Sequence, residues 1–110
     1  MTFSDAFKTT DDNGILTLTK YTGDSEDVII PDGIVIIGSH AFTDIASVKS
    51  VTVPGSVKCI SQLAFSNMNN LEKVVLREGV EEIEYGAFSN CNNLKEVKFP
   101  VSIKQATVMK

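Results

Sequence analysis

The sequence predicts a solenoid, in which short repeats of similar structure stack on one another around one continuous core. Apolar residues recur in fixed columns every 23 residues without a gap, from residue 28 to the end of the chain. Turn-forming sequences, Pro-Asp-Gly at residues 31–33 and Pro-Gly-Ser at residues 54–56, recur with the same period. A unit of this length cannot bury its apolar residues against itself, so three or more units must stack.

The repeats run over residues 28–50, 51–73 and 74–96, and a partial fourth covers residues 97–110. An Ala-Phe pair recurs at residues 41–42, 64–65 and 87–88, and Val48, Leu71 and Leu94 close the three full units. The remaining apolar columns are Val28, Val51, Val74 and Val97; Ile30, Val53, Leu76 and Phe99; Ile34, Val57, Val80 and Ile103; and Ile37, Ile60, Ile83 and Ala106. We expect these columns to form the core.

Each repeat is expected to contain two short extended pieces and one compact turn. Apolar residues alternate at the start of a unit with the period of two that a strand requires. Proline then ends the strand at residues 31, 54 and 100, with Arg77 as the exception. A second extended piece, Val57 to Ile60 in the middle unit, points its end residues inward. The Ala-Phe pair is expected to begin a helical or 3-10 turn.

The first 27 residues are expected to be an N-terminal tail and a capping strand, followed by the repeat domain over residues 28–110. Ile15 to Lys20 alternates like a strand, and we expect it to pair with the edge of the first repeat and blunt that edge. Residues 1–13 are mostly polar, which favours either a loose tail or a flap over the first repeat.

The repeat resembles the BspA-like leucine-rich repeats of bacterial surface proteins and of some parasitic protists. The residues that carry the resemblance are Leu71, Val74, Leu76, Val80, Ile83, Ala87, Phe88, Cys91 and Leu94. Residues 13–23 also look like the lead-in that precedes the first repeat in that family. The resemblance implies a right-handed α/β leucine-rich repeat solenoid, with parallel strands stacked rung on rung and short helical or 3-10 turns. It also implies an adhesion or ligand-binding role, commonly at a cell surface.

Composition argues against several classes of partner. Lys and Arg total 10 against 14 for Asp and Glu, so the net charge is -4, which disfavours nucleic acid and anionic membranes. No apolar stretch is long enough to insert into a membrane, and the first residues lack a basic segment followed by an apolar run. As written, the chain is expected to be cytoplasmic, or else to be a piece of a longer secreted or cell-surface protein.

No arrangement of residues points to catalysis, a cofactor or a metal ion. The single histidine, His40, shares its column with Leu63, Gly86 and Met109, so the repeat reserves no base there. Neither a triad spacing nor a nucleophile elbow is present. We therefore expect a protein that is not an enzyme.

The two cysteines are expected to be free thiols. Cys91 shares its column with Ile45 and Met68, which is typical of a small buried hydrophobic residue. Cys59 shares its column with the mixed set Ile36, Glu82 and Gln105, which is typical of the surface. The two thiols therefore occupy different parts of the repeat and lack the CxxC spacing of a metal site.

Charged columns alternate in sign from one repeat to the next. One column reads Lys58, Glu81, Lys104 and another reads Lys49, Glu72, Lys95. This alternation accounts for the acidic cluster of Glu78, Glu81, Glu82 and Glu84 better than a calcium loop does, since the loop spacing is absent. Each exposed pair contributes only about 0.2–1 kcal/mol, so the pairs are expected to favour correct register over slipped stacking.

A ligand would be expected to bind on the outward residues of the main sheet. These residues are Ile29, Ser50, Thr52, Lys73, Val75, Glu96 and Lys98. Ile29 and Val75 are the members that most favour a binding site, because they are apolar but lie outside the core columns. Strand propensity alone also accounts for β-branched residues there. We expect a non-enzymatic protein-interaction or adhesion-type module whose ligand is a protein, with a glycan as the other possibility. The alternative is a structural spacer or capping segment of a larger repeat protein, which forms homo-oligomers through its C-terminal rung.

Overall fold

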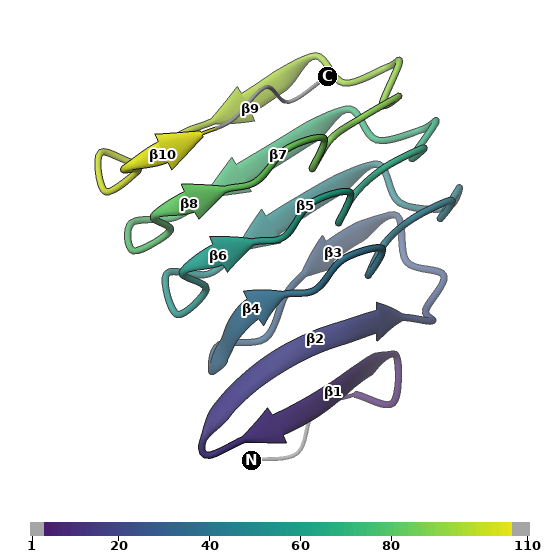
Figure 1. The fold of residues 1–110 in the computed structure, drawn as a ribbon. Coiled ribbons are helices and arrows are strands. Elements are labelled where there is room, and N and C mark those ends of the chain that lie inside the picture. Colours follow the sequence, from purple (N-terminus) through teal and green to yellow (C-terminus); the bar gives the residue numbers. More distant parts are fainter. Residues whose placement is uncertain (1–3, 107–110) are drawn as a thin grey trace.

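The computed structural model of the chain describes residues 4–106, and side chains only up to residue 104 (Figure 1). The side chain of Ala106, together with Met109 of the His40 column and Lys110 of the Ala column, lies outside the described residues. The strands are β1 (Phe7–Asp12), β2 (Ile15–Tyr21), β3 (Asp27–Ile29), β4 (Ile34–Ile37), β5 (Ser50–Val53), β6 (Cys59–Ile60), β7 (Lys73–Leu76), β8 (Glu82–Ile83), β9 (Glu96–Lys98) and β10 (Gln105–Ala106).

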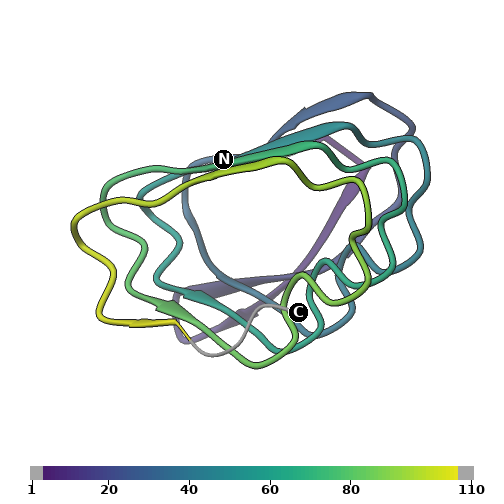
Figure 2. The same cartoon turned by 90° about the horizontal axis from the view of Figure 1, so that it is seen from above.

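The strands form two sheets that face each other across the core. The six-stranded sheet has the order β1-β2-β4-β6-β8-β10, and the four-stranded sheet has the order β3-β5-β7-β9. Seen from above, successive turns of the chain lie over one another as closed loops of similar outline (Figure 2). From β3 onward, each turn of the chain, which we name a rung, contributes one strand to each sheet.

The register of the strands reproduces the sequence repeat. Val51 pairs with Val74, and Val74 with Val97, so neighbouring strands are offset by one repeat. All strand pairs are parallel except the antiparallel pair β1–β2. The apolar columns of the three full repeats are buried, with Leu94 half-buried at the end of the last one. The predicted parallel-strand leucine-rich repeat solenoid is thereby confirmed.

The phenylalanines of the Ala-Phe pairs stack as one column through the molecule. Ring centroids lie 4.9 Å apart for Phe42 and Phe65 and 5.2 Å apart for Phe65 and Phe88. Tyr21 extends the column, 5.0 Å from Phe42, and Phe7 covers Tyr21 at 5.3 Å with its ring tilted by 49°. These five rings form an aromatic ladder that runs from the N-terminal hairpin to the last full repeat.

The turn that carries the Ala-Phe pair differs from the expected helical or 3-10 turn, since no helix occurs within residues 4–106. In the first repeat, hydrogen bonds run from Ala41 N–H to the Gly38 carbonyl and from Thr43 N–H to the His40 carbonyl. Both His40 and Asp44 have positive φ, 62° and 66°. A left-handed residue at each end prevents the right-handed helical path from continuing, so the chain forms overlapping tight turns instead.

The N-terminal segment folds as a hairpin against the first rung. Asn13 and Gly14 form its tight turn with φ of 53° and 87°, and Gly14 N–H donates to Asp11 Oδ1 at 2.8 Å. Of the two alternatives for residues 1–13, residues 7–12 therefore take the ordered one, as β1. Strand β2 pairs with β4 of the first rung. Within the described residues, no helix has the length and apolar character that crossing a bilayer would require.

Candidate binding surface

The outward residues of the four-stranded sheet form two parallel rows, which we name the four-strand face. The register aligns Asp27 with Ser50, Lys73 and Glu96 in one row, and Ile29 with Thr52, Val75 and Lys98 in the other. All seven residues expected at a ligand site lie on this face and are brought together by it. Parallel pairing of strands offset by one repeat produces the rows, because side chains alternate between the two sides of a strand.

The four-strand face combines an exposed apolar edge with fixed polar contacts. Ile29, on the first strand, is 74% exposed, whereas Val75 is half-buried. The Ser50 hydroxyl donates to Asp27 Oδ1 at 2.6 Å, and Lys98 Nζ lies 3.7 Å from Glu96 Oε2. Polar groups at both ends of the rows and the apolar side chain of Ile29 at the first strand offer both hydrogen bonding and apolar contact to a partner.

Asp27 is also part of this face, although the repeat pattern did not predict it. It lies one position before Val28, where the first repeat was taken to begin, so its place in the Ser50 and Lys73 column was overlooked. Extending each repeat by one residue at its start would have found it. The side chain places a carboxylate at the first strand of the face, next to Ile29.

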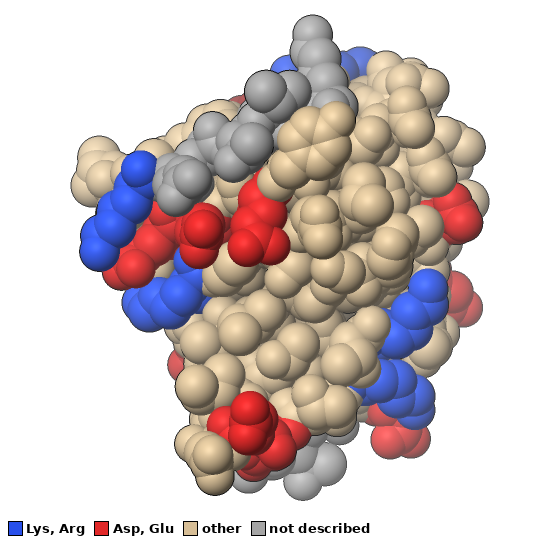
Figure 3. Space-filling model, viewed as in Figure 1, with Lys and Arg blue, Asp and Glu red and all other residues tan. Residues whose placement is uncertain are grey.

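The outer surface of the six-stranded sheet is a second candidate surface, which the sequence did not predict. Its central row aligns Thr17 with Ile36, Ile36 with Cys59 and Cys59 with Glu82. This is the surface that faces the viewer in Figure 3, where the middle part is mainly uncharged and acidic side chains lie above it and below it. Lys104 Nζ lies 3.6 Å from Glu81 Oε1 beside this acidic group.

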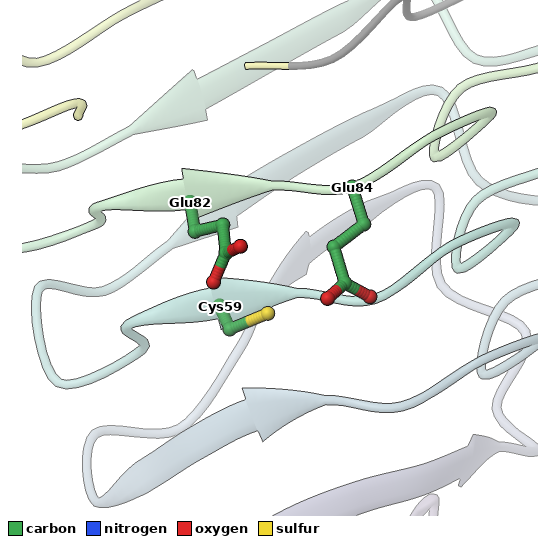
Figure 4. Close-up of side chains that lie close together, drawn as sticks. All are labelled: Cys59, Glu82 and Glu84. Atoms are coloured by element: carbon green, nitrogen blue, oxygen red, sulfur yellow. The ribbon is translucent and has the colours of Figure 1, made fainter. Parts of the chain in front are cut away.

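Cys59, Glu82 and Glu84 converge on this second surface. The side chains of Glu82 and Glu84 extend from the β8 rung toward Cys59 on β6, and the sulfur and carboxylate oxygens all lie within 4.8 Å of one another (Figure 4). The group could not be predicted from residue spacing within one repeat, because Cys59 and Glu82 belong to different rungs. All three residues are half-buried. They are the ligand types that a divalent cation accepts, although none is deeply enclosed.

The surroundings of Cys59 keep its thiol protonated. Burial and the neighbouring carboxylates of Glu84 and Glu82 together raise the pKa of Cys59 to about 11. Burial is the largest cause, and the carboxylates contribute because they repel a thiolate. A reactive cysteine needs the opposite environment, in which positive charge stabilises the thiolate. Cys59 therefore has the electrostatics of an inert thiol.

Cys91 and His40 make contacts that belong to the packing and turns of the repeats. Cys91 is half-buried, its Sγ donates to the Phe65 carbonyl at 2.9 Å, and burial raises its pKa. Both cysteines are free. His40 is exposed, and its Nδ1 lies 3.2 Å from Thr43 Oγ1 within the Ala-Phe turn. His40, Leu63 and Gly86 all have positive φ, between 61° and 67°, so their column is defined by backbone conformation rather than by side-chain chemistry.

The last rung exposes side chains that are buried in the rungs below it. Phe99 is 46% exposed, whereas Leu76, its equivalent one rung earlier, is 3% exposed. The other members of the last rung that belong to core columns, Leu94, Val97 and Ile103, are half-buried. A hollow of about 350 Å³ lies beside them, lined by Phe88, Asn90, Cys91, Asn92 and Leu94. This end therefore exposes apolar side chains whose equivalents form the core in the other rungs.

Comparison with known proteins agrees with this architecture. A family model described as the BspA type leucine rich repeat region (6 copies) matches residues 19–108. The structure of a leucine-rich repeat protein from Bacteroides capillosus matches with a TM-score of 0.88 and 30% sequence identity, over 96% of this chain and 86% of that chain. The T. pallidum leucine rich repeat protein matches with a TM-score of 0.84 and 28% identity, over 96% of this chain and 53% of that chain.

A leucine rich cell surface protein from Faecalibacterium prausnitzii shares the fold, with a TM-score of 0.84 and 24% identity. The alignment covers 96% of this chain but only 32% of that protein. The chain thus spans about a third to about half of two of these relatives and most of the third. The curated proteins compared with the chain contain no match.

Proposed function

The chain belongs to the BspA-type leucine-rich repeat family, and we propose that it is a binding module that uses the four-strand face to hold a protein ligand. Proteins with this repeat fold are generally non-enzymatic interaction or adhesion modules. One structural relative is a cell surface protein, and adhesion at a cell surface is the setting we propose for this chain as well.

The exposure of Ile29 on the four-strand face is the observation that supports this proposal. Ile29 is 74% exposed, and the second apolar side chain of its row, Val75, lies two strands away. Strand propensity also favours a β-branched residue at this position, so the support comes from Ile29 together with Val75 in one row that carries polar groups as well. Apolar anchors among polar groups are typical of protein-binding surfaces.

A protein ligand fits this face better than a glycan does. The hydroxyl of Ser50 already donates to Asp27, and no aromatic ring lies among the residues of the two rows, so the face offers no ring on which a sugar could stack. Paired charges such as Lys98 and Glu96 suit the charged side chains of a protein partner. We retain a glycan as an outcome that the experiment distinguishes.

The proposal is tested by replacing Val75 with glutamate. The labelled chain is applied to an array of purified extracellular proteins and to an array of defined glycans. We expect binding to particular proteins, and we expect Val75→Glu to abolish it without lowering the thermal midpoint, because Val75 points away from the core. Ile36→Glu, the same kind of change on the six-stranded sheet, is the matched control and should retain binding.

Binding that survives Val75→Glu, or that is lost only in Ile36→Glu, would contradict the four-strand face as the ligand site. Binding restricted to the glycan array, and sensitive to Val75→Glu, would replace the protein ligand with a glycan. Absence of any bound protein or glycan would contradict the ligand-binding role itself.

The exposed last rung favours a second candidate function, a structural segment that associates through its end. Phe99 is 46% exposed, and Leu94, Val97 and Ile103 are half-buried although their columns form the core elsewhere. An uncovered repeat end promotes association because it leaves core residues and strand edges available. Mass in solution should then rise with protein concentration, and Phe99→Asp or Ile103→Asp should suppress the rise. A chain that stays monomeric throughout would contradict this candidate.

A further inference from the structure

Strand β9 is the last strand of the four-stranded sheet among the described residues, and its outer edge has a defined set of backbone donors and acceptors. Ile30 N–H donates across to the Thr52 carbonyl of the next rung at 3.0 Å. Phe99 is the equivalent of Ile30 in the last rung, so its N–H points to the same side, away from β7. Edge groups of this kind are a template for pairing with another strand.

A carbonyl and a second donor lie on the same edge. The Lys49 carbonyl accepts from Glu72 N–H at 2.8 Å in the next rung, and Lys95 is the residue equivalent to Lys49 in the last full repeat. Its carbonyl therefore points outward beyond β9. Val97 lies two residues from Phe99, and since backbone groups alternate sides along a strand, the N–H and carbonyl of Val97 point outward too.

These groups are complementary to a second copy of themselves. We propose that two copies of the chain associate through β9, which pairs antiparallel with β9 of the second copy about a two-fold axis at Val97. The proposal deepens the second candidate function and rests on it. In this register Val97 exchanges two hydrogen bonds with its own equivalent, and Phe99 N–H donates to the Lys95 carbonyl of the second copy. A two-fold interface is self-complementary in just this sense.

The charges of β9 support the antiparallel register. Glu96 and Lys98 both point outward from the sheet and are exposed, while Val97 between them points toward the core. Pairing about Val97 sets Glu96 opposite Lys98 of the second copy, and Lys98 opposite Glu96. Opposite charges directly across a strand pair stabilise it, and like charges destabilise it. A parallel arrangement in the same register would place Glu96 against Glu96 instead.

Apolar contacts complete the interface. The side chains of Val97 and Phe99, which belong to core columns, would be covered by the second copy, and both cores would become continuous across the junction. The same register brings Val101 of the second copy, 93% exposed in one copy, beside the hollow next to Leu94. Apolar burial of this kind is the main driving force of association.

Charge exchange between Glu96 and Lys98 tests the pairing. Sedimentation of the full chain from micromolar to millimolar concentration should show a monomer and a dimer in equilibrium. Lys98→Glu and Glu96→Lys should each raise the dissociation constant about tenfold, because both symmetric pairs become repulsive. The double variant Glu96→Lys with Lys98→Glu should restore dimerisation, since opposite charges again face each other.

A matched control and a second measurement keep the outcomes distinct. Lys20→Glu makes the same charge change on β2, at an exposed lysine far from β9, and should leave the dissociation constant unchanged. Amide exchange of Val97 and Phe99 in the wild-type chain should slow at high concentration. Association that is equal in all four variants would overturn β9 pairing while leaving end association intact. A monomer at every concentration would overturn both, and neither result bears on binding by the four-strand face.

Discussion

The environment of the Cys59 thiol is set by stacking and not by its neighbours in the sequence. Glu82 lies 23 residues further along the chain, yet the register places it directly across from Cys59 on the adjacent strand. Burial and the two carboxylates of Glu82 and Glu84 act in the same direction, because each penalises the thiolate. A residue with no unusual local sequence thereby acquires an unusual pKa.

The raised pKa of Cys59 is expected to affect both the reactivity of its thiol and the free energy of unfolding at alkaline pH. The pKa of Cys59 is raised from 9.0 to about 11 in the folded chain, so the unfolded chain loses this proton at lower pH than the folded chain does. The contribution of Cys59 to the free energy of unfolding is therefore complete below pH 9 and falls as pH rises from there toward 11. Iodoacetamide labelling of the folded chain, with the alkylation rate of Cys59 determined by mass spectrometry at each pH, follows the ionisation because only the thiolate reacts.

Replacing the carboxylates separates their effect from that of burial. In Glu82→Gln with Glu84→Gln, the labelling midpoint of Cys59 should shift to lower pH but stay above 9.0, since burial is the larger cause. Cys91, whose pKa is raised by burial without a carboxylate partner, provides the internal control and should keep its midpoint. An unchanged Cys59 midpoint in the double variant would show that Glu82 and Glu84 do not act on the thiol.

At the scale of the element, one position in the turn that follows each strand of the four-stranded sheet alternates between glycine and serine. Residues 33 and 79 are glycines with positive φ, and the equivalent residues 56 and 102 are serines. The Ser56 hydroxyl accepts from Gly33 N–H at 3.0 Å and donates to the Ile34 carbonyl at 2.9 Å. Ser102 makes the same two contacts to Gly79 and Val80. Each serine thus fixes the glycine turn of the rung before it.

Ser56→Ala is expected to destabilise the chain by about 1 kcal/mol, because Gly33 N–H and the Ile34 carbonyl both lose their hydrogen-bond partner. Amide exchange of Gly33 should become faster at the same time. Ser39→Ala, at an exposed serine in the Ala-Phe turn, is the control and should change the free energy of unfolding by less than about half that amount. Unaltered Gly33 exchange in Ser56→Ala would contradict a clamping role for the hydroxyl.

The elements also show what a repeat pattern can and cannot predict. Columns such as Val51, Val74 and Val97 predict the core and the strand register, because identical environments require identical residue types. The conformation of the Ala-Phe turn escaped prediction, since Leu63 adopts a φ of 61° that its residue type disfavours. Here the stacked rungs above and below impose the backbone path.

The aromatic ladder and the candidate site were predictable to different degrees. Phe42, Phe65 and Phe88 follow from the repeat, but Phe7 joins them only through Tyr21, which lies 21 residues before Phe42 and breaks the period. Likewise, the rows of the four-strand face follow from alternation along a strand. The grouping of Cys59 with Glu82 and Glu84 depends on side-chain directions that the pattern of the sequence does not contain.

For the whole molecule, stacking makes stability depend on position along the solenoid. Each rung contacts only its neighbours, so a central rung supports two interfaces whereas the N-terminal hairpin supports one. Phe65 lies fully buried between two rings of the aromatic ladder, and Phe7 is half-buried and contacts the ladder from one side. Loss of the Phe65 ring should therefore destabilise more of the rungs than loss of the Phe7 ring.

Phe65→Ala is expected to lower the free energy of unfolding by about 3–5 kcal/mol, against a total of about 5–15 kcal/mol for a typical domain. Amide exchange should accelerate in every rung, because removal of the central ring weakens both interfaces of the middle unit. Phe7→Ala should lower it by about 1–2 kcal/mol and accelerate exchange in β1 and β2 alone. Chemical denaturation gives the energies, and exchange measured by mass spectrometry gives their distribution. Equal acceleration throughout the chain in Phe7→Ala would show that the hairpin and the rungs unfold as one unit, contrary to nearest-neighbour stacking.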